Sequence, residues 1–293
     1  MRFGFHYADF SFPGAPATTA DDLRRTAQVA DEGGASWFSV MDHFFQLESL
    51  RGPQNPMLEA YTTLGFLAAV TERIRLGVVV TGVTYRHPGL LAKTATTLDV
   101  LSKGRSFLGL GAAWYEREHH ALGVPFPSVA ERFERLEETL RIALQMWGDE
   151  EGAFEGRHYR LAETINVPQP VQRPHPPIVI GGNGELKTLR LVARYAQGTN
   201  IIASGGPEMV AHKLEVLRRH CDELGRDYGA IEKTIQLAFD PLKEPDRLLR
   251  EAEQYAALGI EHIHVGAGGP DPAATAERFC SGPGARLLEL QPA

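Results

Sequence analysis

Short apolar runs alternate with longer amphipathic stretches along the whole chain. The short runs are nearly continuous in Val, Ile, Leu and Phe, which is typical of parallel strands buried on both faces. The longer stretches have the apolar spacing of helices that cover such a sheet. There are eight short runs: RFGFHY (2–7), WFSVMD (37–42), IRLGVVV (74–80), SFLGLG (106–111), PIVIGG (177–182), TNIIAS (199–204), TIQLAF (234–239) and HIHVGA (262–267).

Eight strand–helix units are the number that closes a TIM barrel, and 293 residues lie in the usual size range of that fold. An open doubly wound sheet is disfavoured because it has fewer strands and because no GxGxxG follows the first run. The pattern therefore predicts an α/β protein, a (β/α)8 TIM barrel formed by a single domain over residues 1–293.

Two helix starts have the spacing of a capping box. Thr19 with Asp22, and Ser128 with Glu131, are expected to bond each other's backbone amides at the first turn. The first of these helices should end at Gly33–Gly34.

Residues 148–176 break the alternation, with four prolines near the end of the segment and no clear period. We expect an insertion near the C-terminal face that shapes substrate access, because long connections in barrels are usually functional. A surface excursion with a small hairpin at FEGRHYRL is the alternative.

The composition narrows the class of protein. A net charge of −7 argues against a general nucleic-acid or membrane-surface role, and no apolar run is long enough to span a bilayer. Cys221 and Cys280 are isolated, and the N-terminus lacks the order of a signal peptide. We therefore expect a cytoplasmic protein whose partner is a small molecule.

Candidate chemistry gathers at the carboxyl ends of the strands, where barrels place their active sites. Asp42 and His43 end the second run, and a histidine there can give or take a proton near neutral pH. Adjacent strand residues point to opposite faces, so Asp42 need not contact His43. A histidine that is only hydrogen-bonded at a strand end is the alternative.

Glycines follow the fifth run, at Gly181, Gly182 and Gly184, before a helix expected near Glu185. Free backbone amides at a helix start form a seat for phosphate, although glycines also simply turn a strand into a helix. The sixth run ends similarly, in Ser204–Pro207. Together they favour a phosphate-bearing ligand.

Other strand ends carry weaker signals. Small residues before Trp114 would let a flat ring lie close to backbone, and Arg86 after the third run is a candidate for an anionic tail or a solvated charge. His262 and His264 share one strand face, but no second HxH or acid completes a metal site, so core or rim histidines are favoured and no metal is expected.

Nearly the whole chain resembles the bacterial luciferase-like flavin and deazaflavin oxidoreductases, and within them the branch that uses coenzyme F420. The resemblance rests on MDHF (41–44), on the long run RIRLGVVVTGVTYRHPGLLAKTATTLDVLSKGRSFLGLGAAWYEREH (73–119), on FEGRHYRL and PVQRPHPPIVIGGNGE (154–161 and 170–185), and on TLRLVARYAQGTNI (188–201). It implies a TIM barrel, redox chemistry and a homodimer.

By this resemblance, a deazaflavin ring (8-hydroxy-5-deazaflavin, coenzyme F420, with FMN as the alternative) lies at the carboxyl end of the barrel. His43 is implied as the catalytic proton donor or acceptor. A non-prolyl cis peptide is implied at Val79–Val80 or the neighbouring bond. The cofactor-binding residues are Asp42, His43, Val79, Val80, Gly111, Ala112, Ala113, Ile180, Gly181 and Gly182, and the candidate substrate pocket is Tyr7, Phe44, Trp114 and Tyr115.

Two departures from the family pattern leave the substrate open. Ala112–Ala113–Trp114 replaces a shorter strand end and narrows the pocket, and residues 196–199 read Ala-Gln-Gly-Thr where relatives commonly read ADGW. The favoured hypothesis is an F420-dependent oxidoreductase that moves a hydride between the deazaflavin C5 and a small organic substrate. The alternatives are an FMN-dependent two-component monooxygenase and a non-catalytic flavin- or deazaflavin-binding protein.

Overall fold

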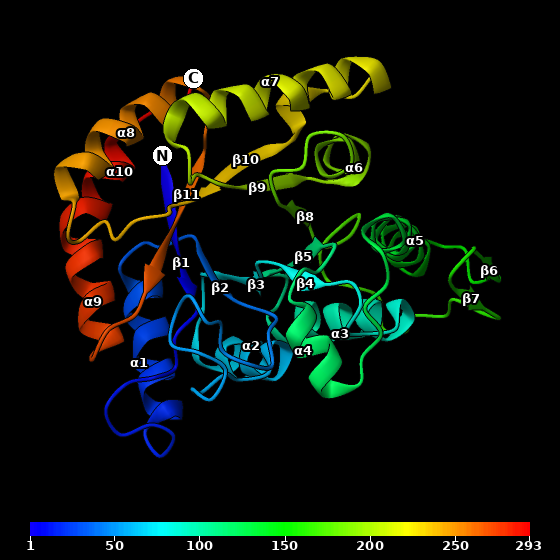
Figure 1. The fold of residues 1–293 in the computed structure, drawn as a ribbon, viewed down its shortest axis with the longest axis horizontal. Helices are drawn as coiled ribbons and strands as arrows, with labels where there is room; N and C mark the ends of the chain where they lie inside the picture. Colours follow the sequence, from blue (N-terminus) through cyan, green and yellow to red (C-terminus); the bar gives the residue numbers. More distant parts are fainter.

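A closed ring of parallel strands forms the centre of the computed structural model, which describes residues 1–293. Neighbouring strands pair in the order β3-β2-β1-β11-β10-β9-β8-β5, and a β3–β5 pairing closes the ring. The TIM-barrel prediction is therefore confirmed, with all eight predicted runs as its strands (Figure 1). Their bounds are β1 Arg2–Tyr7, β2 Trp37–Val40, β3 Arg75–Val78, β5 Ser106–Gly111, β8 Ile178–Gly181, β9 Gly198–Ile202, β10 Glu232–Gln236 and β11 His262–Ala267.

An extra two-residue strand, β4 (Thr81–Gly82), follows β3 and pairs with the end of β5. The peptide bond between Val79 and Val80, between β3 and β4, is cis, at the position that the resemblance implied.

Helices surround the barrel on its outside (Figure 1). Four of them, α3, α7, α8 and α9, have a proline in the first turn, where the missing N–H costs no hydrogen bond. The helices are α1 Thr19–Glu32, α2 Ala60–Val70, α3 Pro88–Leu101, α4 Glu116–Leu122, α5 Val129–Met146, α6 Thr188–Tyr195, α7 Gly206–Leu224, α8 Pro245–Ala257, α9 Pro272–Phe279 and α10 Ala285–Glu289. None of them combines the length and the apolar character needed to cross a membrane.

The predicted helix caps are only partly confirmed. At α5, Ser128 Oγ accepts the amide of Glu131 at 3.3 Å, but the Glu131 carboxylate pairs with Arg135 instead of reaching back. At α1 the predicted Thr19 cap is wrong, because the cap position is Thr18 and its side chain makes no capping bond. The turn before the helix supplies the acceptors there, since the amide of Thr18 donates to the Gly14 carbonyl. As predicted, α1 ends at Glu32, with Gly33 as its cap.

The 148–176 segment contains the predicted hairpin, formed by β6 (Phe154–Glu155) and β7 (Arg160–Leu161). The buried Glu138 carboxylate on α5 accepts the amides of Arg157 at 2.7 Å and Tyr159 at 3.0 Å, which holds the hairpin to the outside of that helix. The Tyr159 ring lies 5.5 Å from His87 at the start of α3, so the hairpin approaches the carboxyl end of the barrel from outside.

The backbones of β3 and β5 approach each other very closely at Gly109. An added Cβ on Gly109 in β5 would lie only 1.8 Å from the carbonyl oxygen of Val78. Glycine is therefore required at this position, where β3 ends against β5.

We expect Gly109→Ala to lower the free energy of unfolding by about 3 kcal/mol, since the methyl group can be accommodated only by moving backbone. Urea unfolding measures the change. The matched control is Gly65→Ala inside α2, where an added Cβ meets no atom within 4 Å and helix propensity should raise stability by about 0.5 to 1 kcal/mol. A Gly109→Ala protein as stable as the wild type would contradict the close approach.

Candidate functional site

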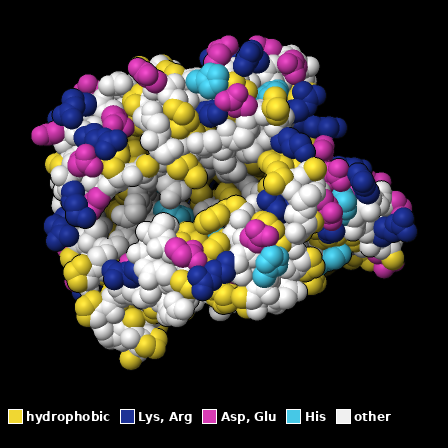
Figure 2. Space-filling model, viewed as in Figure 1, with side chains coloured by type: hydrophobic (Ala, Val, Ile, Leu, Met, Phe, Trp, Pro, Cys, Tyr) yellow, Lys and Arg dark blue, Asp and Glu magenta, His cyan; other side chains and the backbone are white.

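A cavity of about 540 Å³ opens at the carboxyl ends of the strands. Its walls come from the loops after β2, β3, β5 and β8, from the starts of α5 and α6, and from the ends of β1, β9 and β10. The space-filling view is hollowed at its middle, with hydrophobic and histidine side chains visible inside (Figure 2). The volume is within the range of small-molecule sites.

Most of the predicted site residues line this cavity. They come from four separate segments of the chain, and they are Asp42, His43, Val79, Val80, Gly111, Ala112, Ala113, Trp114, Gly181 and Gly182. Barrel closure therefore brings together residues that are up to 140 positions apart, Asp42 and Gly182 being the extremes.

Four predicted residues do not line the cavity. Tyr7 lies fully buried between Phe10 and Phe38 on the helix side of β1, and Ile180 is inside β8, paired with Leu110 and Thr199. The Phe44 ring packs on Tyr85, 5.3 Å away, and Tyr115 packs behind His43. None of the residues 148–176 lines the cavity either, so the expectation that this segment shapes substrate access is not supported by its position.

The floor of the cavity is built from glycines packed against one valine. An added Cβ would lie 2.6 Å from the Val80 side chain at Gly111 and 2.7 Å from it at Gly181. The missing side chains leave a flat surface of backbone and valine methyl groups. A planar ring could lie against such a surface.

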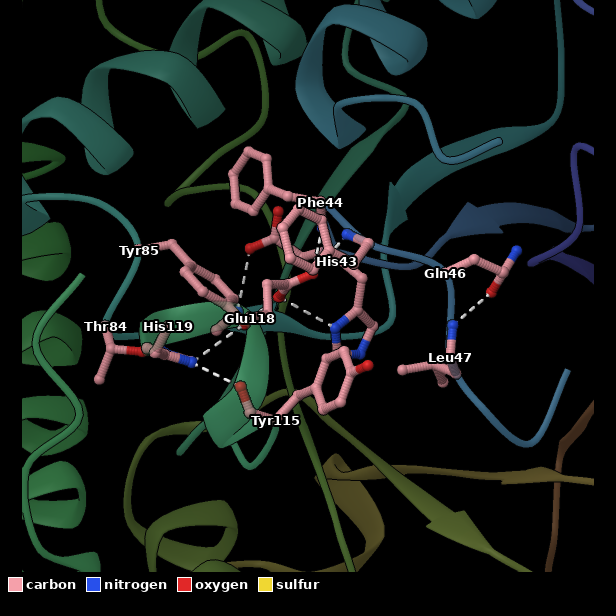
Figure 3. Close-up of polar contacts among 12 residues, drawn as sticks. His43, Phe44, Gln46, Leu47, Thr84, Tyr85, Tyr115, Glu118 and His119 are labelled. Carbon is pink, nitrogen blue, oxygen red and sulfur yellow. Dashed lines mark hydrogen bonds and ion pairs between the residues drawn. The ribbon is translucent and has the colours of Figure 1, made fainter. Parts of the chain in front are cut away.

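His43 stands in the cavity wall with one ring nitrogen held from behind. Its Nδ1 lies 3.3 Å from Oε1 of Glu118, a buried carboxylate at the start of α4 (Figure 3). A carboxylate only accepts, so Nδ1 carries the proton and Nε2 is left for the cavity. The rings of Trp114 and Tyr115 meet the imidazole edge to face at 5.5 and 5.6 Å.

Glu118 collects further donors from the surrounding loops. The amides of Phe44 and Phe45 donate to its Oε2 at 2.5 and 2.6 Å, and the Tyr85 hydroxyl donates to Oε1. Burial raises the pKa of the carboxyl, but the hydrogen bonds from His43, Tyr85 and Phe45 outweigh that effect and hold the pKa below its ordinary value of 4.5. Glu118 is therefore ionised at neutral pH.

Asp42 makes no hydrogen bond to His43, which agrees with the expectation that adjacent strand residues point to opposite faces. Its carboxylate accepts from Arg86 at 2.7 Å and from the Gly82 amide at 3.0 Å. Arg86 also pairs with Glu59 at 2.5 Å and is largely buried, so it is not available for an anionic tail. Burial raises the pKa of Asp42, and Arg86 and Gly82 oppose that rise.

A second histidine, His6, lines the cavity from the end of β1. Its Nδ1 is 3.0 Å from the Ser39 hydroxyl. Burial, reinforced by the nearby His43, lowers the pKa of His6 to about 4, so this ring is neutral at physiological pH.

The glycine-rich end of β8 leaves free amides before α6, which starts at Thr188 and not near Glu185. The Gly182 amide donates to the Asn200 carbonyl at 3.0 Å, whereas the amides of Asn183 and Gly184 have no protein acceptor. Gly184 and Thr188 line the cavity, so an anion could bind at this helix start. The second glycine-rich end, Ser204–Pro207, does not line the cavity.

His262 and His264 lie in the interior of the barrel, away from the cavity. Their rings hydrogen-bond each other at 3.1 Å and pack on Trp37. No group of three or more His, Cys, Asp or Glu side chains in the structure is arranged to hold a metal ion.

The family model described as luciferase-like monooxygenase matches residues 1–282. The chain belongs to the luciferase-like monooxygenase family. Among curated relatives, it is 31% identical over 266 residues to the F420-dependent glucose-6-phosphate dehydrogenase of Kineococcus radiotolerans, covering 89% of this chain and 74% of the relative.

Solved structures support the fold of this luciferase-like protein. An F420-dependent secondary alcohol dehydrogenase, in complex with an F420–acetone adduct, superposes with a TM-score of 0.79 at 17% identity, covering 96% of this chain and 97% of the other. The monooxygenase RslO1 from Streptomyces bottropensis gives 0.74 at 22% identity, covering 96% and 98%. At these sequence identities the structural similarity shows the fold but does not show the activity.

Glu118 and His6 of the luciferase-like protein are functional candidates that sequence reasoning missed. Glu118 stands in EREHH, a charged run that is typical of a solvated helix face, and is 75 residues from His43. His6 is next to Tyr7 in an apolar strand. The two residues differ in the direction of their side chains, and only the His6 side chain lines the cavity.

Glu118→Gln in the luciferase-like protein is expected to lower the free energy of unfolding at pH 7 by about 2 kcal/mol, because an amide leaves part of the donor set unsatisfied. The folded-state pKa of Glu118 lies below 4.5, so the ionised carboxylate stabilises the fold above pH 4.5 and that contribution is lost as the pH falls below 4.5. The difference between wild type and variant should therefore shrink in acid.

Urea titrations at neutral and acid pH measure this difference. The control is Glu116→Gln, a 64% exposed glutamate on the same helix, which should leave stability unchanged. A Glu118→Gln protein with wild-type stability at pH 7 would show that the carboxylate does not hold these loops.

Proposed function

We propose that this protein is an F420-dependent oxidoreductase that moves a hydride between the deazaflavin and a small organic substrate, with His43 as proton donor or acceptor. The proposal rests on the position of His43 in the structure. Its Nδ1 is fixed by the buried Glu118 carboxylate, and its ring lines the cavity at the carboxyl end of the barrel. A histidine held in this way presents one nitrogen in one orientation, which is what proton transfer requires.

The residues around the cavity fit a planar, phosphate-bearing cofactor. Val80, Gly111 and Gly181 form the flat floor, and Trp114 forms part of the wall. The unbonded amides of Asn183 and Gly184, in the loop between β8 and α6, would receive a phosphate group. Asp42, fixed by Arg86, lines the same cavity and would help to hold the cofactor.

When bound, the deazaflavin supplies or accepts the hydride at its C5. The protein's part is to hold the substrate in the remaining space and to exchange a proton at His43 Nε2. The Glu118 carboxylate orients the imidazole through Nδ1, while neutral His6 contributes a polar contact without a competing charge. Hydride and proton together then interconvert a carbinol and a carbonyl group.

The named activities of relatives support this class of reaction over the alternatives. A relative 31% identical over most of the chain is an F420-dependent dehydrogenase, and an F420-dependent alcohol dehydrogenase has the same fold. RslO1, a monooxygenase, shares that fold, so binding of FMN has to be measured alongside binding of coenzyme F420.

Cofactor identity is tested by fluorescence titration of the purified protein with coenzyme F420 and, in parallel, with FMN. We expect saturable binding of coenzyme F420 with at least tenfold preference over FMN, about 1.4 kcal/mol of discrimination. Tight FMN binding with none of the deazaflavin would overturn the proposal in favour of the monooxygenase.

His43→Gln should slow turnover by a factor of about 10² to 10⁴ while leaving the Kd for coenzyme F420 nearly unchanged, since the ring is proposed to move a proton and not to hold the cofactor. Activity is followed by loss of cofactor absorbance with alcohols and sugar phosphates as candidate substrates. His120→Gln, a 67% exposed histidine on α4, is the control. Equal turnover in wild type and His43→Gln would exclude the proton-transfer role.

The homodimer and the cytoplasmic location remain proposals that rest on family membership. The α3 helix has exposed apolar side chains available for self-association, Leu90 at 69% and Leu101 at 61% exposure. Light scattering should give twice the 32.2 kDa mass of the chain, and a monomer would rule out the dimer.

A further inference from the structure

Three uncharged polar side chains line one arc of the cavity wall. His6 comes from the end of β1, Asn200 from β9 and Gln236 from the end of β10. In the ring of strands, this polar arc lies across the barrel from β3 and β5, at whose ends Val80 and Gly111 form the flat floor. The cavity therefore has one apolar side, built largely of backbone, and one polar side that faces it.

Two of these side chains keep polar atoms that no other protein group uses. His6 Nδ1 lies 3.0 Å from the Ser39 hydroxyl, whereas Nε2 of the same ring has no partner in the protein. The Gln236 side chain, which is only partly buried, makes no hydrogen bond within the protein. Because a glutamine amide both donates and accepts, the polar arc offers a ligand both kinds of hydrogen bond.

The third side chain, Asn200, is held from behind in one orientation. The Thr234 hydroxyl donates to the Thr199 carbonyl at 2.8 Å, so it has only acceptor capacity left for Asn200. Asn200 Nδ2 donates to that hydroxyl at 3.0 Å, which directs the amide nitrogen toward β10. The oxygen Oδ1 is the atom that remains without a protein donor.

No charged side chain belongs to the polar arc. Among Asp, Glu, Lys and Arg, only Asp42 and Arg132 line the cavity. Asp42 is paired with Arg86 at 2.7 Å, and Arg132 comes from α5, whose apolar face packs in one core cluster with β5 and β8. Burial lowers the pKa of His6 to about 4, so the arc is uncharged at neutral pH. The desolvation that opposes a charge on His6 also opposes a charge on a ligand bound against it.

We propose that the polar arc is the substrate-binding face of the cavity and selects an uncharged alcohol or carbonyl compound over a phosphorylated or carboxylated one. This rests on the proposed function, since the substrate then lies between the polar arc and a cofactor ring on the floor. His6 and His43 follow each other around the rim, at the ends of the paired strands β1 and β2. His6, Asn200 and Gln236 bind the substrate and take no part in proton transfer.

A sugar phosphate finds no matching cation on the polar arc. Such a substrate is part of the name of the 31% identical relative from Kineococcus radiotolerans. Phosphate and carboxylate groups are bound most strongly by charge-assisted hydrogen bonds from Arg and Lys, and the arc has neither. A hydroxyl or carbonyl group needs only neutral donors and acceptors. We therefore expect this protein to reject substrates by their charge.

The first test places a charge on the polar arc. Gln236→Lys adds a cation beside the substrate and removes no internal hydrogen bond, and Gln254→Lys adds the same charge at an exposed position of α8 as the matched control. Steady-state kinetics with coenzyme F420 compare uncharged secondary alcohols, methyl lactate and glucose with lactate and glucose 6-phosphate. In the wild type and in Gln254→Lys, kcat/KM of the best uncharged substrate should exceed that of either anion by about 10², and Gln236→Lys should lower this ratio by about tenfold or more.

The second test does not depend on turnover. Nitrogen NMR of labelled histidine follows the Nε2 resonance of His6, which is assigned by its loss in His6→Gln, while methyl lactate or lactate is added. The two compounds differ in charge and share the same carbinol group. Methyl lactate should shift the His6 resonance in both the cofactor-free and the cofactor-loaded protein, and lactate should not. The resonance of His120, a 67% exposed histidine on α4, is the internal control and should not move.

The inference is overturned if lactate or glucose 6-phosphate is turned over as efficiently as the best uncharged substrate, or if Gln236→Lys has the same preference as Gln254→Lys. A His6 resonance that responds to both compounds or to neither overturns it as well. The wild-type kinetics and the NMR titration need no substituted protein to reach a negative result, so a poorly folding variant does not protect the proposal. If the wild type binds no deazaflavin, the proposed function fails, and the cofactor-free titration still decides whether the polar arc discriminates by charge.

Discussion

The site depends on one buried carboxylate. Glu118 accepts hydrogen bonds from His43, from the amides of Phe44 and Phe45, and from the Tyr85 hydroxyl, so one side chain on α4 fixes the loops after β2 and β4 (Figure 3). Taking an ionised carboxylate out of water is costly unless its lone pairs are satisfied, and here the donors come from two parts of the chain, residues 43–45 and Tyr85. His43 can be oriented toward the cavity because these loops cannot move independently.

The strands could be predicted because their burial is visible in the sequence. Each is buried on both faces, so each is a short apolar run, and eight such runs leave few folds other than a closed barrel. The same uniform burial hides which residues face inward. His6 and Tyr7 are neighbours in one apolar strand, and the prediction chose Tyr7 although it is His6 that lines the cavity.

Polar contacts between residues far apart in the sequence could not be predicted, because they depend on how the chain packs. Glu118 reads as a solvated helix residue because EREHH is charged throughout, and only the packed fold buries it. Thr19 fits a capping pattern, but the preceding turn satisfies the amides at the start of α1 first. Local patterns thus predict elements, whereas the partner that satisfies each buried polar group depends on tertiary packing.

The charges around the cavity divide into paired and unpaired groups. Asp42 and Arg86 satisfy each other, and Glu118 satisfies His43, while Arg132 lines the cavity with no carboxylate partner and donates only to the Pro127 carbonyl. We expect a flat cofactor to bind between the Val80 floor and His43. A crystal structure of the complex with coenzyme F420 would decide this, and we expect it to show the deazaflavin ring against Val80 and Gly111, with its C5 side facing His43 Nε2. A ring bound elsewhere, or bound here with His43 turned away and its bond to Glu118 broken, would contradict it.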